Sequence, residues 1–249
     1  MTDPRAPRIA VSIVSHRQAP LVQALLEDLA QHAPDVAIHL TANLPEPPPT
    51  ALLPFTLLTN PHPRGFGENH NAALKDSDAD FFCVLNPDIR LTSNPFPALL
   101  EGLNDPRVGL VVPQVSTAQG IPEDSARHFP TPFGLMKKVV GLNDGRILSS
   151  GSEPYPIDWG AGMFLLFRAK AFRAVQGFDE NFFLYYEDVD ICVRLWARHW
   201  QVKLCPQVTV IHDARRDSRR KLRYTLWHLS SMARYFFKHG GRLPATTAR

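Results

Sequence analysis

The chain has 249 residues, of which 44% are hydrophobic and 20% are charged, and it carries a formal net charge of +3. These values are ordinary for a globular protein of one large or two small α/β domains, and they exclude a disordered or collagen-like chain. No apolar run approaches the roughly 20 residues of a membrane span, and residues 1–8 are too polar for a signal peptide.

The three cysteines favour a reduced, intracellular environment. Cys83, Cys192 and Cys205 are odd in number, lack Cys-x-x-Cys spacing and lie in apolar contexts. We therefore interpret them as buried thiols of a cytosolic protein.

The first part of the chain has the pattern of a βαβ unit. Residues 9–15 are β-branched and predict a strand, and Pro20 suits the first turn of the helix that follows, up to about residue 34. Residues 36–41 and 55–59 predict two further strands. This order predicts a parallel sheet with right-handed crossovers.

A loop at residues 60–67 leads into the next predicted helix. Gly65 and Gly67 flank an aromatic residue there. A loop between a strand and a helix can hold a phosphate on the helix N-terminus. The third glycine of the dinucleotide fingerprint and the P-loop lysine are both missing, so an ordinary turn remains an alternative.

Residues 81–85 are apolar on both faces, which predicts a central, buried strand. Asn86, Pro87 and Asp88 follow, and Pro87 ends the strand because it has no N–H to donate. Asp88 is thus placed at the carboxyl edge of the sheet, where ligands bind in open α/β folds. It could bind a cation there, or the three residues could form only a turn.

The middle of the chain alternates regular and irregular segments. We expect a helix at residues 94–103 and a buried strand at 108–113. Residues 114–158 are irregular, with a short amphipathic piece at 135–140. A loop of this length inside a compact domain often shapes a site.

Residues 158–167 predict one strand, which begins with the small residues Gly160 and Gly162. These glycines would allow a ligand or another strand to approach the backbone closely. A helix at 168–175 should follow and end at Gly177.

Four aromatic residues precede Glu187, Asp188 and Asp190 at the start of a helix with an apolar stripe. Acids at a helix N-terminus are favoured by the helix dipole, so capping is one explanation. A general base held beside an apolar wall is the other, because three acids exceed what capping requires.

Residues 202–205 and 208–212 predict two short extended pieces, and His212 is the last residue of the second. This histidine can have a structural role or bind a metal. Residues 215–223 then carry six basic side chains, which favours an anionic partner. The run is short and no nucleic-acid recognition motif accompanies it, so we do not expect nucleic acid as that partner.

The last predicted helix, residues 222–239, is amphipathic. Its apolar face can pack on the domain, or Trp227, Tyr235 and Phe236 with the nearby arginines can rest on an anionic membrane surface. We expect residues 240–249 to be a frayed tail.

Five motifs in this order carry a family resemblance: GFGENHNAAL, a strand ending in LNPD, WGAGMFLLFR, FFLYYEDVDICVRLW, and VIH before the basic run. The chain resembles family 2 glycosyltransferases of the GT-A fold, in particular rhamnosyltransferase-like bacterial members, over residues 8–240. The resemblance implies an α/β fold, with a Rossmann-like, mostly parallel sheet and helices on both faces. We expect this domain at 1–214, followed at 215–249 by the basic segment and C-terminal helix.

The resemblance also implies an inverting sugar transfer from a nucleotide-diphosphate sugar. Asp188 would be the catalytic base, with Glu187 supporting the acceptor site, and Asp88 and His212 would bind Mg²⁺ or Mn²⁺. The nucleotide and donor would be held by Ser15, His16, Asn60, Arg64, Gly65, Gly67, Asn71, Asn86, Asp88, Gly162, Arg215 and Arg216. The acceptor would be bound by Trp159, Gly160, Tyr186 and Glu187.

As donor the resemblance suggests dTDP-L-rhamnose, and as acceptor a lipid-linked or other oligosaccharide in the synthesis of O-antigen or capsule. We would then expect a cytoplasmic protein, peripheral on the inner face of the cytoplasmic membrane. Many relatives have Asp where this chain has Asn86. A catalytically inactive nucleotide-binding or scaffold protein is therefore the alternative, and an active enzyme should bind cations weakly without donor.

Overall fold

The computed structural model describes residues 6–50, 52–123, 125–139, 145, 147, 151–213, 222–240 and 242–247. The predicted donor-binding residues Arg215 and Arg216 lie outside these ranges.

The elements follow the predicted order closely in the first half of the chain. They are β1 (Ile9–Ser15), α1 (Ala19–His32), β2 (Ala37–Ala42), β3 (Phe55–Thr59), α2 (Phe66–Leu74), β4 (Phe81–Leu85), β5 (Ile89–Arg90), α3 (Phe96–Gly102) and β6 (Val108–Ser116). The second half consists of β7 (Ala126–Arg127), α4 (Pro132–Val139), β8 (Tyr155–Pro156), β9 (Trp159–Gly160), β10 (Phe164–Arg168), α5 (Ala169–Ala174), α6 (Glu187–Ala197), β11 (Gln201–His212) and α7 (Leu222–His239).

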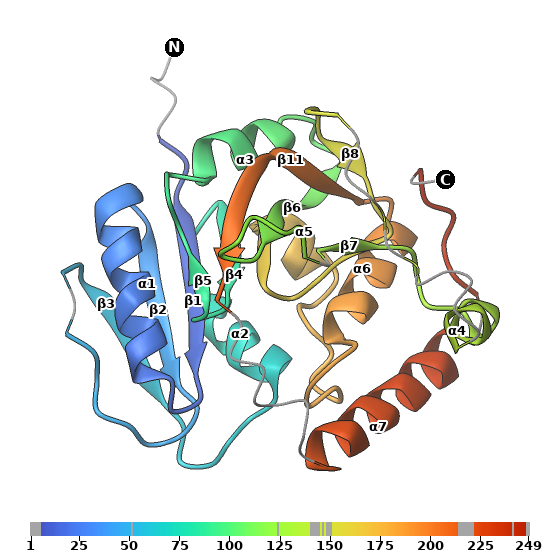
Figure 1. Cartoon of the computed structure of the whole chain (residues 1–249), viewed down its shortest axis with the longest axis horizontal. Helices are drawn as coiled ribbons and strands as arrows, with labels where there is room; N and C mark the ends of the chain where they lie inside the picture. The colour runs from blue at the N-terminus through green and yellow to red at the C-terminus, as the bar shows by residue number, and fades with distance from the viewer. Residues whose placement is uncertain are drawn as a thin grey trace.

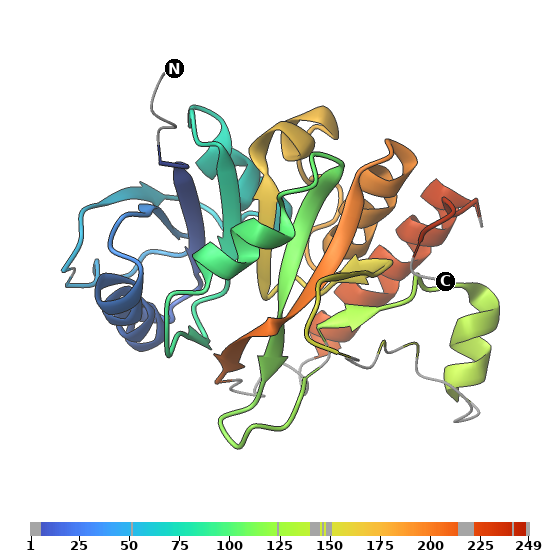
Figure 2. The same cartoon turned by 90° about the horizontal axis from the view of Figure 1, so that it is seen from above.

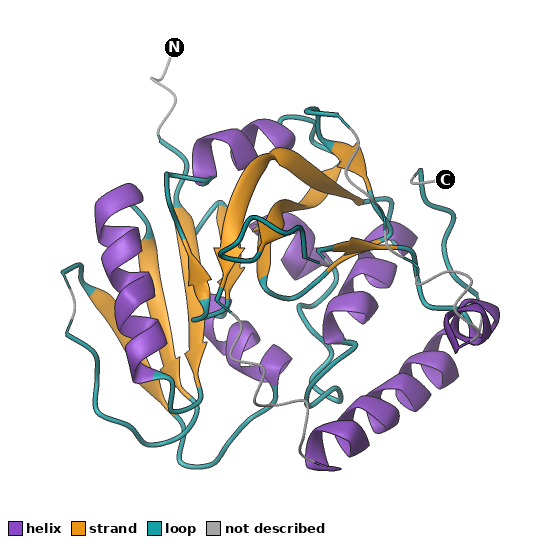
Figure 3. Ribbon diagram, viewed as in Figure 1, coloured by secondary structure: helices purple, strands orange, loops and turns teal. Residues whose placement is uncertain are grey.

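The main sheet has the strand order β3-β2-β1-β4-β10-β6-β11-β5, with β8 paired to β11 (Figures 1 and 3). The strands β1 to β4 are parallel, as are β6 and β11, whereas β10 runs antiparallel to both of its neighbours. The expected mostly parallel α/β sheet is therefore confirmed. The strand β4 lies between β1 and β10, which explains why its sequence is apolar on both faces.

Helices cover both faces of the sheet, as Figure 2 shows from above. On one face, Leu25 of α1 and Leu99 of α3 pack with Cys83 of β4 in one core cluster. On the other face, residues of α2, α5 and α6 pack with Phe82 and Val84 of the same strand. Alternate side chains of β4 thus pack into two hydrophobic cores, one on each face of the sheet, and this double packing fixes β4 at the centre of the molecule.

Two strand predictions need correction. Residues 158–167 do not form one strand, because the chain bends between β9, which pairs with β7, and β10, which joins the main sheet. The two pieces predicted at 202–212 are instead one strand, β11, with an irregularity between Cys205 and Thr209. Pro206 lies at this irregularity and cannot donate to the ladder.

The C-terminal helix packs on the domain. Tyr235 is only 1% exposed and belongs to the core cluster that contains α6, with Phe236 packed against that cluster. The ring of Trp227 lies 4.8 Å from that of Phe183. The aromatic residues that we considered for membrane contact therefore face the protein.

The described residues 242–247, after α7, also pack on the domain. Leu243 packs against the same core cluster, and the Thr246 hydroxyl donates a hydrogen bond to the buried Asp158 carboxylate. The expectation of a frayed tail was wrong for these residues. Among the described helices, none is both long and apolar enough to cross a membrane.

Candidate active site

Asp88 and His212 meet at the carboxyl edge of the sheet. The turn after β4 is closed by a hydrogen bond from the Ile89 N–H to the Asn86 carbonyl, and β5 then pairs with the end of β11. This pairing places His212 Nε2 3.2 Å from Asp88 Oδ2. Two residues that are 124 positions apart in the sequence are thus brought together by strand pairing.

Glu123, which the sequence did not indicate, lies on the other side of the His212 ring. Its Oε2 is 2.5 Å from His212 Nδ1. Burial lowers the pKa of His212, but hydrogen bonds and charge interactions with Asp88 and Glu123 outweigh burial and raise that pKa to about 9. Glu123 lies in the long loop after β6, and no local pattern distinguishes it from a solvated acid.

The residues around Asp88 fit a divalent cation. Asp88 Oδ1 is buried and has no hydrogen-bond partner among the described residues, so it is available to a ligand. The 3.2 Å between Asp88 Oδ2 and His212 Nε2 is close to the roughly 3 Å between adjacent ligands of an octahedral Mg²⁺ at about 2.1 Å. Glu123 would then accept the remaining N–H of His212, as carboxylates do beside metal-bound histidines.

Protein ligands alone do not complete this cation site. No group of three or more His, Cys, Asp or Glu side chains in the described part of the chain is arranged to hold a metal. Asp88 and His212 supply two ligands, so donor phosphates and water would have to supply the rest. A cation would also have to displace the proton from His212.

Asp188 lies in the first turn of α6 and is held by backbone donors. Its Oδ2 accepts the Gly162 N–H at 3.0 Å and its Oδ1 accepts the Val189 N–H at 2.8 Å. Burial raises the pKa of Asp188 to about 6, against the opposing effect of these hydrogen bonds and of the Arg127 charge. Asp188 is therefore mostly ionised at neutral pH but accepts a proton more readily than an exposed Asp.

Gly162 connects Asp188 to the end of β4. The residue after it, Met163, accepts a hydrogen bond from the Asn86 N–H at 3.0 Å. A Cβ on Gly162 would be 3.6 Å from Asp188 Oδ2, so the two residues are in contact. Asp188 and the Asn86–Asp88 turn therefore lie at the same edge of the sheet, as the sequence predicted. The Asn86 side chain makes no hydrogen bond to another described residue, which leaves its amide available to a ligand.

Glu187 is almost fully buried, and its Oε2 has no hydrogen-bond partner among the described residues. Burial first, and the charge of Asp188 second, raise its pKa well above the usual range and favour the neutral acid. Any effect of Glu187 on an acceptor would therefore pass through Asp188 beside it.

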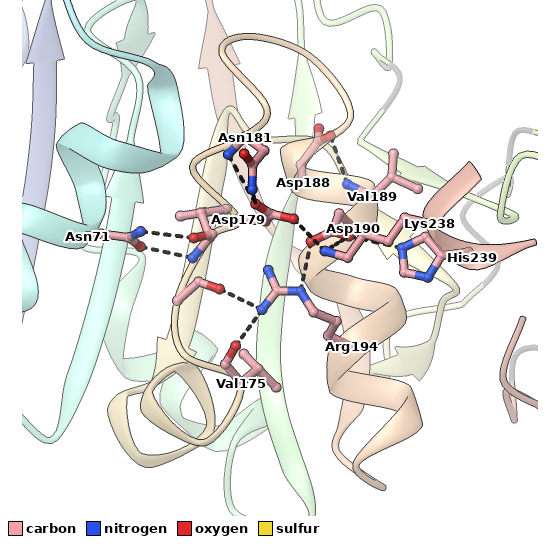
Figure 4. Close-up of polar contacts among 12 residues, drawn as sticks. Asn71, Val175, Asp179, Asn181, Asp188, Val189, Asp190, Arg194, Lys238 and His239 are labelled. Carbon is pink, nitrogen blue, oxygen red and sulfur yellow. Dashed lines mark hydrogen bonds and ion pairs between the residues drawn. The ribbon is translucent and has the colours of Figure 1, made fainter. Parts of the chain in front are cut away.

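Asp190 faces away from the site toward α7 (Figure 4). It is fully buried, and its carboxylate contacts Arg194 at 2.7 Å, Lys238 at 2.7 Å and His239 at 2.9 Å. Burial acts to raise the pKa of Asp190, but these cationic and hydrogen-bonding partners lower it overall. This carboxylate attaches α7 to the first turn of α6.

Tyr186, expected at the acceptor, lies instead against α7. It is 8% exposed, and its ring is 5.4 Å from those of His228 and Tyr235. Tyr185 and Tyr186 both have positive φ angles, 71° and 66°, a conformation that costs non-glycine residues energy. This turn directs Glu187 and Asp188 into the site while the Tyr186 side chain packs behind them.

The two glycines of the 60–67 loop are explained by packing. A Cβ on Gly65 would lie 3.1 Å from the Phe183 carbonyl oxygen, and one on Gly67 would lie 2.5 Å from the Phe178 Cβ. The glycines therefore allow α2 to approach the 178–183 segment. The same contact places this loop next to the turn that carries Asp188.

Three other predicted donor-binding residues also have structural partners. Asn60 donates to Asn43 and Asn69 within a buried amide network, and this network holds the backbone of Arg64. The Arg64 side chain itself is exposed and pairs with Glu68. The Asn71 amide both donates to and accepts from the Phe178 backbone.

The predicted acceptor residues Trp159 and Gly160 are held by the small second sheet. The Trp159 indole donates to the His128 carbonyl at 3.0 Å, and the residue as a whole is partly exposed. A Cβ on Gly160 would lie 2.5 Å from Val112 Cγ1, so this glycine is required for packing.

Ser15 ends β1, and His16 follows it, next to a small, mostly apolar cavity at the carboxyl ends of β1 and β2. Ser15 lines it with Glu46 and a wall formed by Pro47, Pro48 and Pro49. Both carboxylate oxygens of Glu46 are buried and lack a hydrogen-bond partner among the described residues. Glu46, another residue that the sequence did not indicate, is therefore available to donors on a ligand.

The mixed α/β sheet, with Asp88, His212 and the buried Asp188 at one edge and a cavity beside the first strands, has the GT-A fold. Two solved structures have this fold: GalNAc-T7 with UDP, GalNAc and Mn²⁺ (TM-score 0.70, 14% identity) and the mannosyltransferase PcManGT from Pyrobaculum calidifontis with GDP-Man and Mn²⁺ (TM-score 0.60, 16% identity). They match 94% and 93% of this chain, which spans 48% and 64% of theirs.

The chain belongs to glycosyl transferase family group 2, whose family model matches residues 81–238. Rhamnosyltransferase WbbL of Escherichia coli (strain K12) is 30% identical over 183 residues, which is 69% of each chain. The N-acetylglucosaminyl-diphospho-decaprenol L-rhamnosyltransferase of Mycobacterium tuberculosis is 30% identical over 221 residues, 84% of this chain and 72% of that protein. The chain is thus an enzyme of the glycosyltransferase class.

Proposed function

We propose that this enzyme transfers a sugar, L-rhamnose from dTDP-L-rhamnose, to a lipid-linked or oligosaccharide acceptor with inversion at the anomeric carbon, and that it uses Mg²⁺ or Mn²⁺. The observation that carries the proposal is the placement of Asp188. Its carboxylate is held by the Gly162 N–H, has a pKa of about 6, and lies at the same sheet edge as Asp88 and His212.

In this mechanism, Asp188 takes the proton from the acceptor hydroxyl as that oxygen attacks the anomeric carbon. The bond to the nucleoside diphosphate breaks in the same displacement, so the product has the opposite anomeric configuration. Gly162 holds Asp188 in position, and neutral Glu187 beside it adds no second negative charge. A divalent cation on Asp88 and His212 would stabilise the charge that develops on the diphosphate.

The nucleoside would bind at the carboxyl ends of the first strands. Ser15, His16 and the cavity beside them lie there, and Glu46 offers two unpaired acceptor oxygens to base or ribose donors. Asn86 would then contact ribose or a metal-bound water. We expect four residues to affect donor binding indirectly, because their packing shapes the loop beside the donor: Asn60, Gly65, Gly67 and Asn71.

The choice of sugar and acceptor rests on the relatives. Both named relatives are rhamnosyltransferases, and the name of the mycobacterial protein specifies a decaprenol diphosphate-linked N-acetylglucosamine acceptor. This similarity supports a lipid-linked acceptor. We propose that the acceptor lies at the inner face of the cytoplasmic membrane and serves the synthesis of a surface polysaccharide.

A donor panel tests the proposal. The full chain is incubated with Mn²⁺ or Mg²⁺ and one nucleotide sugar at a time, and release of nucleoside diphosphate is measured with and without a lipid-linked N-acetylglucosamine acceptor. We expect the fastest release from dTDP-L-rhamnose, dependent on both cation and acceptor. Binding of the nucleotide without turnover of any donor would instead support the inactive scaffold that Asn86 suggested.

A further inference from the structure

The helix α7 has two apolar faces, and only one of them is used by the fold. Ser231 and Tyr235 are buried against the domain and donate hydrogen bonds to the carbonyls of Leu184 and Pro130. On the opposite face an outward stripe is formed by Leu222, Leu226, Leu229 and Phe237, which are 75%, 57%, 49% and 93% exposed. Their spacing of four, three and eight residues places them on one side of a helix.

The C-terminal part of the sequence, which contains α7, is strongly basic. Residues 214–249 contain ten Lys and Arg and one acid, Asp217, whereas residues 1–213 contain 17 Lys and Arg and 23 Asp and Glu. The helix α7 itself has no acidic residue. The net charge of +3 for the whole chain thus conceals a basic C-terminal segment on an acidic domain.

We propose that the outward stripe of α7 docks on an anionic lipid surface, to which the basic C-terminal segment attracts the protein. A helix with exposed Leu and Phe on one side and flanking Arg has the properties of an interfacial helix, in which apolar burial and attraction to anionic headgroups both contribute. A second copy of the chain fits poorly as the occupant, because two segments of the same high positive charge would face each other across the contact.

Docking through this face would place the active site beside the lipid. The inner face of α7 contacts the segment that carries Asp188, through the Ser231–Leu184 hydrogen bond and the Asp190 ion pairs shown in Figure 4. In Figure 1, α7 borders the side of the molecule where α6 begins. The benefit for a lipid-linked acceptor rests on the proposed function, whereas docking itself does not.

Vesicle sedimentation with the full chain tests this proposal. The vesicles are phosphatidylcholine alone or phosphatidylcholine mixed with phosphatidylglycerol. The stripe variant is Leu226→Ser with Phe237→Ser, and its matched control is Leu52→Ser with Ile121→Ser, because Leu52 and Ile121 are exposed by 71% and 62% elsewhere on the surface. A third variant, Arg223→Gln with Arg234→Gln, tests the contribution of charge, because both arginines lie exposed on α7.

We expect the wild type and the matched control to bind the anionic vesicles, with binding that weakens as salt is raised. The partition coefficient of the stripe variant should fall more than about tenfold, and that of the arginine variant should fall several-fold. Equal sedimentation of the stripe variant and the wild type, or no vesicle binding by the wild type, would overturn the proposal. So would a wild-type dimer that the stripe variant converts to a monomer in analytical ultracentrifugation.

Donor turnover measured on the same preparations separates this proposal from the proposed function. The stripe variant should keep wild-type turnover with a water-soluble acceptor, because the stripe does not contact the site. Vesicle binding by a wild type that turns over no donor would leave the docking surface intact and refute the enzymatic proposal alone.

Discussion

Asp188 and Asp190 lie two residues apart in the first turn of α6, yet the structure gives them opposite environments. Asp188 faces the site, contacts backbone N–H groups, and has a pKa raised to about 6. Asp190 faces α7, contacts three basic side chains, and has a lowered pKa. The comparison shows that neighbouring acids of one motif can have different roles. Asp188 is suited to proton transfer, whereas Asp190 holds α7 against α6.

Replacing the site-facing acid should have the largest effect. Asp188→Asn removes the proposed base while keeping the shape of the side chain, so we expect kcat to fall by about 10²–10⁴-fold. The melting temperature should be unchanged or higher, because the folded state disfavours the charge of Asp188. Nucleoside diphosphate release and thermal melting measure the two effects, and a variant with wild-type turnover would remove Asp188 from the mechanism.

Replacing the acid that faces α7 should act on stability instead. Asp190→Asn leaves Lys238, His239 and Arg194 without their buried counter-charge, and we expect a loss of about 3–5 kcal/mol in the free energy of unfolding. Turnover per folded molecule should stay near that of the wild type. Urea unfolding checks this, with Asp35→Asn at an exposed position as the control. A stable Asp190→Asn variant with low turnover would reverse the assignment of the two acids.

Glu123→Gln should weaken the cation site by about 10–100-fold, because it removes the carboxylate that orients His212. Titration of activity with Mn²⁺ measures the change, with Glu101→Gln on the exposed side of α3 as a matched control. An unchanged Mn²⁺ requirement would show that Glu123 does not support the metal ligand.

The pH dependence of kcat/KM should show the smallest effect, but this effect reports on Asp188 alone. The pKa of Asp188 is raised by folding, so its active carboxylate form is lost as the pH falls through about 6, and kcat/KM should approach a tenfold decrease per pH unit below that value. Asp190, whose pKa is lowered, stabilises the fold above its ordinary range and stops doing so only in stronger acid. Activity should therefore be lost before folding is, and coincident losses would contradict this account.

The sequence predicted those parts of the molecule that depend on local pattern. The strands β1, β3 and β4 and the helix α7 have the predicted limits, since their apolar periodicity is strong. The pattern of residues 81–88 also predicted Asp88 at the carboxyl edge of the sheet, and in the structure Asp88 follows β4.

What could not be predicted depends on contacts between distant segments. Gly65 and Gly67 suggested a phosphate loop, but Phe183 and Phe178 determine their role, and these residues come much later in the chain. Glu46 and Glu123 resemble surface acids until folding buries their carboxylates beside a cavity or a histidine. The two faces of α7 could be told apart only after one of them had been seen to pack on the domain.

The most direct test of the central claim is the anomeric configuration of the first product, followed by NMR during transfer from dTDP-L-rhamnose in the presence of Mn²⁺. A single displacement with Asp188 as base predicts that the new glycosidic bond has the configuration opposite to that of the donor, in the wild type and in any residual product of Asp188→Asn. A product that keeps the donor configuration from the first turnover would contradict this mechanism, because it requires a covalent or front-face route in which Asp188 is not the general base.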